Sequence, residues 1–168
     1  NLKSNIYYST NWYALLYKYI DADVLQAYDA NKFIFYDNVV SYSDEKKVFA
    51  LLQESMMHKS NLAFVFKGND QQPPDLPMMT ATADHPEMIE GASDKLKVTY
   101  FDANTIVMDM NLDKKQFLVI NDSYATGWQV FVNNQKAFLY RANGAFKGLW
   151  VPSGKSHVVL RFLTPWHY

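Results

Sequence analysis

Residues 121–162 read NDSYATGWQVFVNNQKAFLYRANGAFKGLWVPSGKSHVVLRF, and this stretch decides the fold of the chain. Apolar and polar residues alternate in it with a period of two, as the half-buried strands of an antiparallel sheet require. The turn signals between the apolar runs are Asn133-Asn134 and Pro152-Ser153-Gly154. Asparagine tolerates positive φ, so the first signal predicts the tip of a two-residue hairpin. Proline presets φ at the second position of a turn, so the second signal predicts a type I turn.

The strand pattern continues upstream of this stretch. Its segments are residues 96–100, 106–110 and 117–120. In the first segment Leu96, Val98 and Tyr100 are predicted to share one face of a strand. The last segment is apolar on both faces, as a central strand requires. Short strands at this spacing predict an antiparallel, jelly-roll-like β-sandwich for residues 95–168.

The N-terminal part of the chain carries a different pattern. Residues 33–40 and 62–66 are short runs of apolar, β-branched and aromatic side chains, which predict two strands. Between them Ser43 offers a hydroxyl as an N-cap and apolar residues recur at helical spacing, so a helix is predicted over residues 44–58. A strand, a helix and a strand in this order predict a small α/β unit with parallel strands, and an α+β class for the whole chain.

Proline divides the chain. Four of the six prolines lie in residues 67–94, beside a polar run that buries little surface. Because proline removes backbone donors, this segment is predicted to be a loop or linker. The predicted organisation is an α/β sub-domain at residues 1–66, the proline-rich linker at 67–94 and a sandwich sub-domain at 95–168. A further helix is predicted over residues 11–19, either packed on the domain or presenting an aromatic patch.

The composition of the 168-residue chain excludes several classes of function. Hydrophobic residues make up 49% of the chain, enough for a substantial core, and the net charge of −1 provides no field that attracts nucleic acid. The chain has no cysteine, which excludes disulfides and thiolate chemistry. No apolar run approaches the length of a membrane span. The first residue is asparagine rather than methionine, which favours a fragment of a longer protein.

Several short motifs follow one another in a fixed order in the C-terminal part. They are Asp122-Ser123-Tyr124, Gly127-Trp128, Tyr140-Arg141-Ala142-Asn143, Ala145-Phe146-Lys147-Gly148 and Val151-Pro152-Ser153-Gly154, with Pro165 after the last strand. This order resembles the C-terminal region of the YfhO family, bacterial polytopic membrane proteins that are similar to GT-C glycosyltransferases. The resemblance covers about residues 28–165. The chain departs from the family's pattern at Ala125-Thr126, Asn133-Asn134 and Lys147, and each replacement still fits a turn or an exposed strand.

The resemblance implies a location, a partner and a role. It implies a domain on the extracytoplasmic face of the bacterial cytoplasmic membrane, tethered through its parent protein beside transmembrane helices that carry the transferase chemistry. The partner is then the transmembrane portion of its own parent chain, with a glycan or lipid-linked sugar as a further partner, and Trp166 and Tyr168 are expected at the membrane interface. The fragment itself is expected to be non-catalytic and to cap the transferase or position a glycan acceptor. A stand-alone carbohydrate-binding β-sandwich is the alternative.

Aromatic and polar side chains of this region are candidates for binding a glycan. Aromatic rings stack on the CH faces of sugars, and an arginine or an amide orients the hydroxyls. The candidates are Tyr124, Trp128, Tyr140, Arg141, Asn143 and Trp150. A structural interpretation competes with this one: Trp128 faces the sandwich core, Arg141 pairs with an acid, and Asn143 holds positive φ before a glycine.

No catalytic residue, metal ligand or cofactor is predicted for the chain. Asp21 and Asp23 have the spacing of a metal-binding acid pair, but no phosphate-binding loop accompanies them. The four histidines lack the spacing of a zinc site, and His157 is expected on the surface of a strand. Ser123 and Ser153 are predicted to lie in turns without a partnered histidine, which argues against nucleophilic catalysis.

Overall fold

The computed structural model describes residues 32–42, 45–57, 61–67, 87–89 and 95–163. These residues form two sheets and the helix α3 (Glu45–Met57). The larger sheet has the order β2 (Asn38–Tyr42), β3 (Leu62–Phe66), β10 (Tyr140–Ala142), β11 (Phe146–Val151), β7 (Gln116–Ser123), β1 (Phe33–Tyr36) and β4 (Glu87–Ile89). The smaller sheet has the order β5 (Leu96–Phe101), β6 (Thr105–Leu112), β12 (Gly154–Phe162), β8 (Trp128–Val132) and β9 (Gln135–Ala137). The predicted α+β class with a β-sandwich is confirmed.

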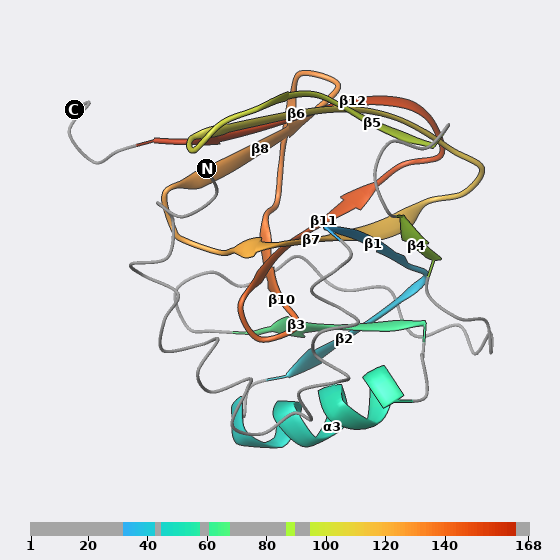
Figure 1. Ribbon diagram of the computed structural model, residues 1–168, viewed down its shortest axis with the longest axis vertical. Helices are drawn as coiled ribbons and strands as arrows, with labels where there is room; N and C mark the ends of the chain where they lie inside the picture. The colour runs from blue at the N-terminus through green and yellow to red at the C-terminus, as the bar shows by residue number, and fades with distance from the viewer. Residues whose placement is uncertain (1–31, 43–44, 58–60, 68–86, 90–94, 164–168) are drawn as a thin grey trace.

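In Figure 1 the smaller sheet lies at the top and β7 and β1 of the larger sheet lie in the middle; β2 and β3 of that sheet lie below these strands, and α3 lies at the bottom. One apolar core lies between the sheets; its buried members include Phe35, Ile106, Met108, Leu118, Ile120, Leu149, Val158 and Leu160. A second core is lined by strands of the larger sheet and by α3, and includes Ile34, Tyr36, Val48, Leu52, Phe64, Phe117 and Val119. Strand β7 is therefore apolar on both faces, as predicted, because successive side chains reach different cores.

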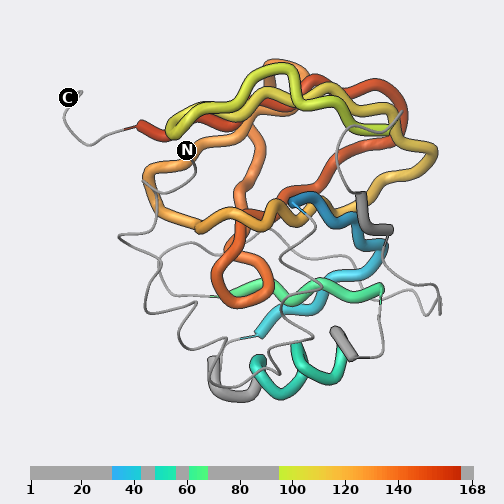
Figure 2. The backbone as a smooth tube through the Cα atoms, viewed as in Figure 1, coloured from blue at the N-terminus to red at the C-terminus, as the bar shows by residue number. Residues whose placement is uncertain are grey.

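Two sharp bends adjoin strands of the smaller sheet. Asn133 and Asn134 have φ of 51° and 65° between β8 and β9, which confirms the predicted two-residue hairpin. Pro152 and Ser153 follow β11, and Gly154 has a φ of 83°, which favours glycine. This second bend carries the chain from the larger to the smaller sheet, a crossing that Figure 2 shows as the tube rises from the middle layer to the top one.

Helix α3 and the strands on either side of it match the predicted α/β unit. The helix occupies residues 45–57 within the predicted 44–58, and β2 and β3 pair in parallel. Residues 11–19 lie outside the described residues. Strands from the predicted units at 1–66 and 95–168 share the larger sheet, since β1 pairs with β7 and β3 with β10. The division into sub-domains at those boundaries stays a prediction.

Two predicted strands differ from the structure. Residues 33–40 are not one strand: the run breaks at Asp37 into β1 and β2, which hold distant positions in the same sheet. In β5 the register with β6 shifts between Val98 and Tyr100. Because such an irregularity changes which face the following side chain takes, Tyr100 is exposed rather than aligned with Leu96.

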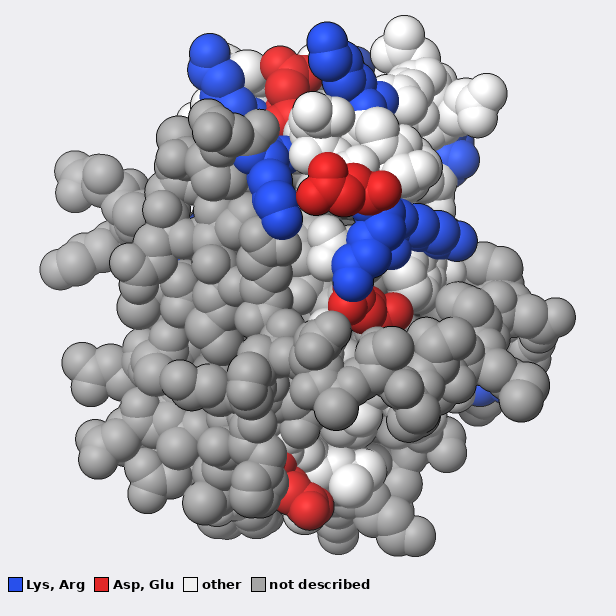
Figure 3. Space-filling view, turned by 90° about the vertical axis from the view of Figure 1, so that its right-hand side faces the viewer, with Lys and Arg blue, Asp and Glu red and all other residues white. Residues whose placement is uncertain are grey.

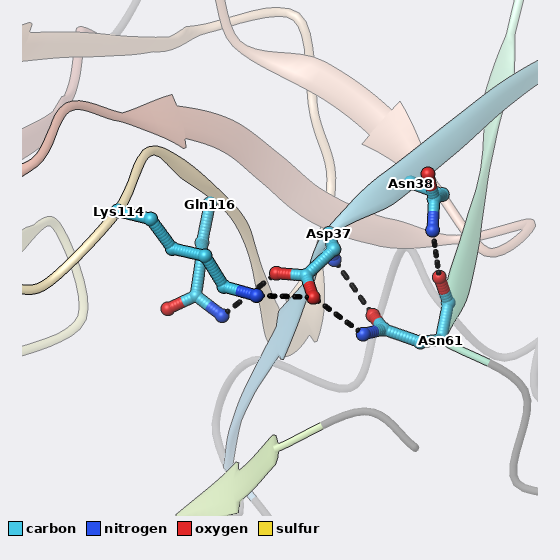
Figure 4. Close-up of polar contacts among 5 residues, drawn as sticks. All are labelled: Asp37, Asn38, Asn61, Lys114 and Gln116. Carbon is cyan, nitrogen blue, oxygen red and sulfur yellow. Dashed lines mark hydrogen bonds and ion pairs between the residues drawn. The ribbon is translucent and has the colours of Figure 1, made fainter. Parts of the chain in front are cut away.

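At the break between β1 and β2, Asp37 makes hydrogen bonds to residues at the starts of β3 and β7 (Figure 4). Its backbone N–H donates to Oδ1 of Asn61 at 2.6 Å, and Nδ2 of Asn61 donates to Oδ2 of Asp37 at 2.8 Å. Gln116 at the start of β7 donates to Oδ1 at 3.1 Å, and Nζ of Lys114 lies 2.6 Å from Oδ2. The carboxylate thereby holds the start of β3 against the start of β7 where the chain passes from one strand position to the other.

Asn143 connects β10 to β3. These strands share a single register pair, Ala142 with Val65, and Asn143 extends the ladder beyond it. The Asn143 N–H donates to the carbonyl of Phe64 at 2.7 Å, while its Oδ1 accepts from the Phe64 N–H at 2.9 Å. The residue is buried and has a φ of 46°, so its backbone conformation and its side chain both stabilise the contact between β10 and β3.

We expect Asn143→Ala to lower the free energy of unfolding by about 3 kcal/mol, because it leaves the buried N–H of Phe64 unpaired in addition to straining the backbone. The matched control is Asn134→Ala: residue 134 also has a positive φ, of 65°, but lies in an exposed hairpin, and the change should cost about 1 kcal/mol. Urea unfolding followed by circular dichroism measures both values. Equal losses in the two variants would show that the Phe64 hydrogen bond contributes nothing.

Asp37 should also make stability depend on pH. Burial raises its pKa, but hydrogen bonds from Lys114, Gln116 and Asn61 outweigh burial and hold the pKa below the ordinary value of 3.8. The stabilisation is therefore present above pH 3.8 and is lost as the pH falls through the folded-state pKa.

Asp37→Asn should cost about 1 kcal/mol at pH 7, and the difference from the wild-type chain should shrink toward zero in acid. Unfolding in urea at a series of pH values from 7 downward measures this difference. Asp113→Asn, which removes an exposed charge beside Lys114, controls for net charge. A difference that stays constant across the series would contradict the role of the carboxylate.

Candidate functional site

Lys147 lies at one end of the inter-sheet core and is the most unusual charged residue among those described. Its side chain is 1% exposed, and it belongs to β11 at a position that alternates with Leu149 on the core-facing side. Its Nζ lies 2.8 Å from Oδ2 of Asp122 and 4.1 Å from the centroid of the Trp128 ring. Because Asp122 belongs to the larger sheet and Trp128 to the smaller one, the ammonium group links the two sheets.

An irregularity in the β7–β11 ladder places Asp122 beside this lysine. Phe146 pairs with Ser123 but Lys147 pairs with Ile120, so Asn121 and Asp122 lie between two consecutive pairs of the register with β11. Such an irregularity bends a strand and changes the direction of its side chains. Oδ1 of Asp122 also accepts a hydrogen bond from the N–H of Ser123 at 2.9 Å, which fixes the carboxylate.

Burial lowers the pKa of Lys147, whereas the charge and the hydrogen bond of Asp122 raise it, and a smaller contribution from the charge of Lys32 lowers it. The net shift is downward from the ordinary value of 10.5. A paired amine without access to solvent is suited to holding the sheets together. It is not placed to attack a substrate.

Aromatic rings surround this pair at the same end of the sandwich. Trp128 packs against the inter-sheet core and meets Phe162 at a centroid distance of 5.5 Å in an edge arrangement. Tyr124 packs on the same core, and its backbone N–H donates to Ala145 at 2.8 Å. Burial raises the pKa of Tyr124, and the charge of Arg141 lowers it to a smaller extent. Tyr124 and Trp128 are therefore the two predicted site residues that share this end.

Tyr140 and Trp150 lie on the other side of the larger sheet. Both contact Phe117, at centroid distances of 5.6 and 5.2 Å, in the core that faces α3. Nζ of Lys115 lies 4.9 Å from the centroid of Trp150. The four predicted aromatic residues thus divide between two cores and do not make one stacking platform.

Arg141 and Asn143, the two polar candidates, hold the β10–β11 hairpin. Nε of Arg141 donates to the carbonyl of Gly144 at 2.7 Å, and its guanidinium carbon lies 4.7 Å from the centroid of Phe66. Asn143 holds positive φ before Gly144, as the structural interpretation predicted, and its amide bonds Phe64 as described above. A glycan-binding role for the six candidates stays a prediction.

A second candidate is a shallow groove of about 420 Å³ on the outer face of the smaller sheet. Lys97, Asp109 and His157 form a row across β5, β6 and β12, and Nδ1 of His157 lies 2.7 Å from Oδ1 of Asp109. The Asp109 carboxylate thus lies between a lysine and an imidazole on the two neighbouring strands, and such cross-strand pairs stabilise a sheet. Basic and acidic groups are likewise interleaved on the side of the molecule seen in Figure 3. The lining of the groove also includes Lys155, so it carries two lysines against the single carboxylate of Asp109.

The comparisons with known proteins identify the family. The family model described as bacterial membrane protein YfhO matches residues 28–168. The chain belongs to the YfhO family. No curated protein and no solved structure matches it. The described residues of this YfhO-family chain include no helix long and apolar enough to cross a bilayer, and no cluster of three potential metal ligands.

Sequence reasoning missed Lys147 in this YfhO-family domain. The chain was predicted to tolerate a lysine there on an exposed strand, but the side chain is buried. The signal was present in the alternation of β11, where residue 147 shares its parity with Leu149 and Val151 on the core-facing side. A lysine at such a position requires a counter-charge, and only the fold shows that Asp122 supplies it.

We expect Asp122→Asn to destabilise the chain by about 3 kcal/mol at pH 7, because it leaves a buried ammonium group without its counter-charge. Lys147→Met, which replaces the charge with an apolar side chain of similar length, should cost about 1 kcal/mol or less, and so should the double variant. Because the unfolded chain holds this proton more tightly, the stability of Asp122→Asn should rise as the pH approaches 10.5. Urea unfolding between pH 7 and 10 measures all three effects, and additive losses in the double variant would contradict the pairing.

Proposed function

We propose that this chain is a non-catalytic, extracytoplasmic accessory domain of a membrane-embedded, GT-C-like glycosyltransferase. In this role the domain caps the transferase or holds a glycan acceptor beside it. The observation that carries the proposal is the family match over residues 28–168, which includes every described strand of the sandwich. Membership of a family of bacterial membrane proteins supports a function exercised beside the membrane.

The arrangement of the charged groups supports a non-catalytic role. Carboxylates that work as a catalytic acid and base stand near each other across an open cleft. Here Asp122 pairs with the buried Lys147 and Asp37 with Lys114, while Asp109 contacts His157. These pairs lie in different parts of the fold; the Asp122 and Asp109 pairs join neighbouring strands, and the Asp37 pair joins two connections between strands. Each is better suited to stabilising the sandwich than to turning over a substrate.

The two-core architecture supports a rigid module. Both faces of β7 are covered, and the polar junctions at Asp37 and Asn143 are satisfied by hydrogen bonds. A rigid body presents one fixed surface to a partner, and this limits the conformational entropy lost on binding. The partner that the family suggests is the transmembrane portion of the same parent chain.

The accessory role predicts that transfer needs the domain but that the domain transfers nothing alone. Removing residues 28–168 from the parent protein should lower sugar transfer in native membranes by at least about tenfold, which corresponds to 1.4 kcal/mol in the activation barrier. The 168-residue chain should give no turnover of a nucleotide-linked or lipid-linked sugar. Transfer is measured with a radiolabelled sugar, and immunoblotting controls for the amount of truncated protein in the membrane.

Two outcomes would change the assignment. Turnover by the isolated chain would make it an enzyme. Calorimetric heat of binding for a free glycan at millimolar concentration or below, combined with unchanged transfer after the truncation, would favour the stand-alone carbohydrate-binding module. In that case Trp128 is the first residue to substitute, since it is the half-buried aromatic side chain beside the Lys147 pair.

A further inference from the structure

The tip of the β5–β6 hairpin exposes two aromatic side chains. Tyr100 is 53% exposed and Phe101 is 44% exposed, and residues 102–104 that follow them are exposed as well. Large aromatic side chains in a folded domain are usually covered, so adjacent exposed rings on a projecting turn need an explanation.

The end of β12 adds a third apolar group at the same place. Leu163 is 49% exposed, and its N–H donates to Gly127 at 2.9 Å. The preceding residue, Phe162, donates its N–H to Asn104 in the tip at 2.7 Å. Figures 1 and 2 show the β5–β6 turn and the end of β12 side by side at one end of the smaller sheet, far from α3. We call Tyr100, Phe101 and Leu163 the apolar tip.

Hydrogen bonds hold the turn in one shape. Oδ1 of Asp102 accepts from the N–H groups of Asn104 and Thr105, at 2.8 and 2.6 Å. The hydroxyl of Tyr100 donates to Oδ2 of Asp102 at 2.7 Å, which satisfies the carboxylate and orients the ring. The apolar tip is thus preorganised, and little conformational freedom is lost when it is buried.

Two cationic side chains lie near the apolar tip. Nζ of Lys32 lies 5.2 Å from the centroid of Phe101, and Arg161 is exposed on β12 opposite Thr105. The acid of this region, Asp102, already accepts three hydrogen bonds. Aromatic and apolar groups with flanking cations are the combination that favours the interface of a bilayer with anionic headgroups.

We propose that the apolar tip inserts into the interface of an anionic bilayer and thereby orients the domain on the membrane. This inference rests on the proposed function and names a contact surface for it. The tip is a projecting hairpin turn rather than a groove, so it fits a soft interface better than a rigid protein surface. Its area is small, and a small area suffices for a domain whose parent protein already keeps it at the membrane.

The absence of cysteine in the chain allows a direct test. A cysteine introduced as Ala103→Cys, in the exposed tip, carries an environment-sensitive nitrobenzoxadiazole label. Ala50→Cys on the exposed face of α3 is the matched control position. With vesicles that contain phosphatidylglycerol and phosphatidylcholine, the label at residue 103 should shift to the blue and brighten severalfold, while the label at residue 50 should not change. Vesicles of phosphatidylcholine alone should give a weaker response.

Substitutions then test which side chains are responsible. Tyr100→Ser, Phe101→Ser and Leu163→Ser together should lower the apparent partition coefficient at least tenfold. Leu51→Ser, which removes an apolar side chain that is 45% exposed on α3, should leave it unchanged. Because the triple variant could be destabilised, its thermal unfolding is compared with that of the wild-type chain, and the single variant Phe101→Ser should lower the partition coefficient in the same direction.

Three results would overturn the proposal. They are no spectral change at residue 103 at saturating lipid, an equal change at residue 50, and an equal response to anionic and neutral vesicles. A change at residue 103 that appears only with the detergent-solubilised membrane portion of the parent protein would also overturn it, in favour of a protein partner. If vesicles give no response but removal of residues 28–168 still lowers transfer, the proposed membrane contact of the apolar tip is wrong, while the proposed accessory role is supported.

Discussion

The larger sheet depends on a constraint at Asp37. Strands β1 and β2 adjoin in sequence, with Asp37 as the single residue between them, but four other strands separate them in the sheet order. A single residue spans this separation only if the sheet curls around, so that its first strand returns toward its sixth. The curl encloses the core that faces α3, and hydrogen bonds from Asn61 and Gln116 to the Asp37 carboxylate hold the two parts together. Between the two strand ladders the backbone N–H and C=O groups have no ladder partners, so side chains must supply their hydrogen bonds.

A few polar contacts also fix the alignment of the two sheets at the end of the sandwich where Lys147 lies. The sheets meet elsewhere through apolar side chains, which have no preferred register, whereas the ammonium group requires Asp122 and the Trp128 ring at defined distances. A buried ion pair adds little net stability compared with an apolar pair of the same volume, but it penalises any other alignment of the sheets. The aromatic rings and the apolar tip at this end therefore keep a fixed relation to the rest of the fold.

The sequence correctly predicted the features that depend on local residue pattern. It did not predict the features that depend on which distant strands pair. The hairpin at Asn133 and Asn134, the helix and the doubly apolar β7 follow from periodicity and turn chemistry. The break at Asp37 was missed because an apolar run carries no sign of which strand each half will join. The six candidate residues were chosen by residue type. The fold distributes their aromatic members over two cores because Trp128 belongs to the smaller sheet, while Tyr140 and Trp150 line the other face of the larger sheet. The family resemblance was confirmed by the match over residues 28–168, and it supplied the membrane context that periodicity alone does not contain.

The junction between β10 and β3 has a consequence for how the molecule opens. Strands β2 and β3 and the helix between them share an apolar core with the rest of the larger sheet, but their backbone connections to it are few. Those described above are one register pair, the hydrogen bonds between Asn143 and Phe64, and those between Asn61 and Asp37. Backbone amides on the two sides of this seam should belong to different cooperative units in native-state hydrogen exchange, with the helical unit exchanging first. Asp37 would then act as a hinge, from which the helical unit swings away while the sandwich stays folded.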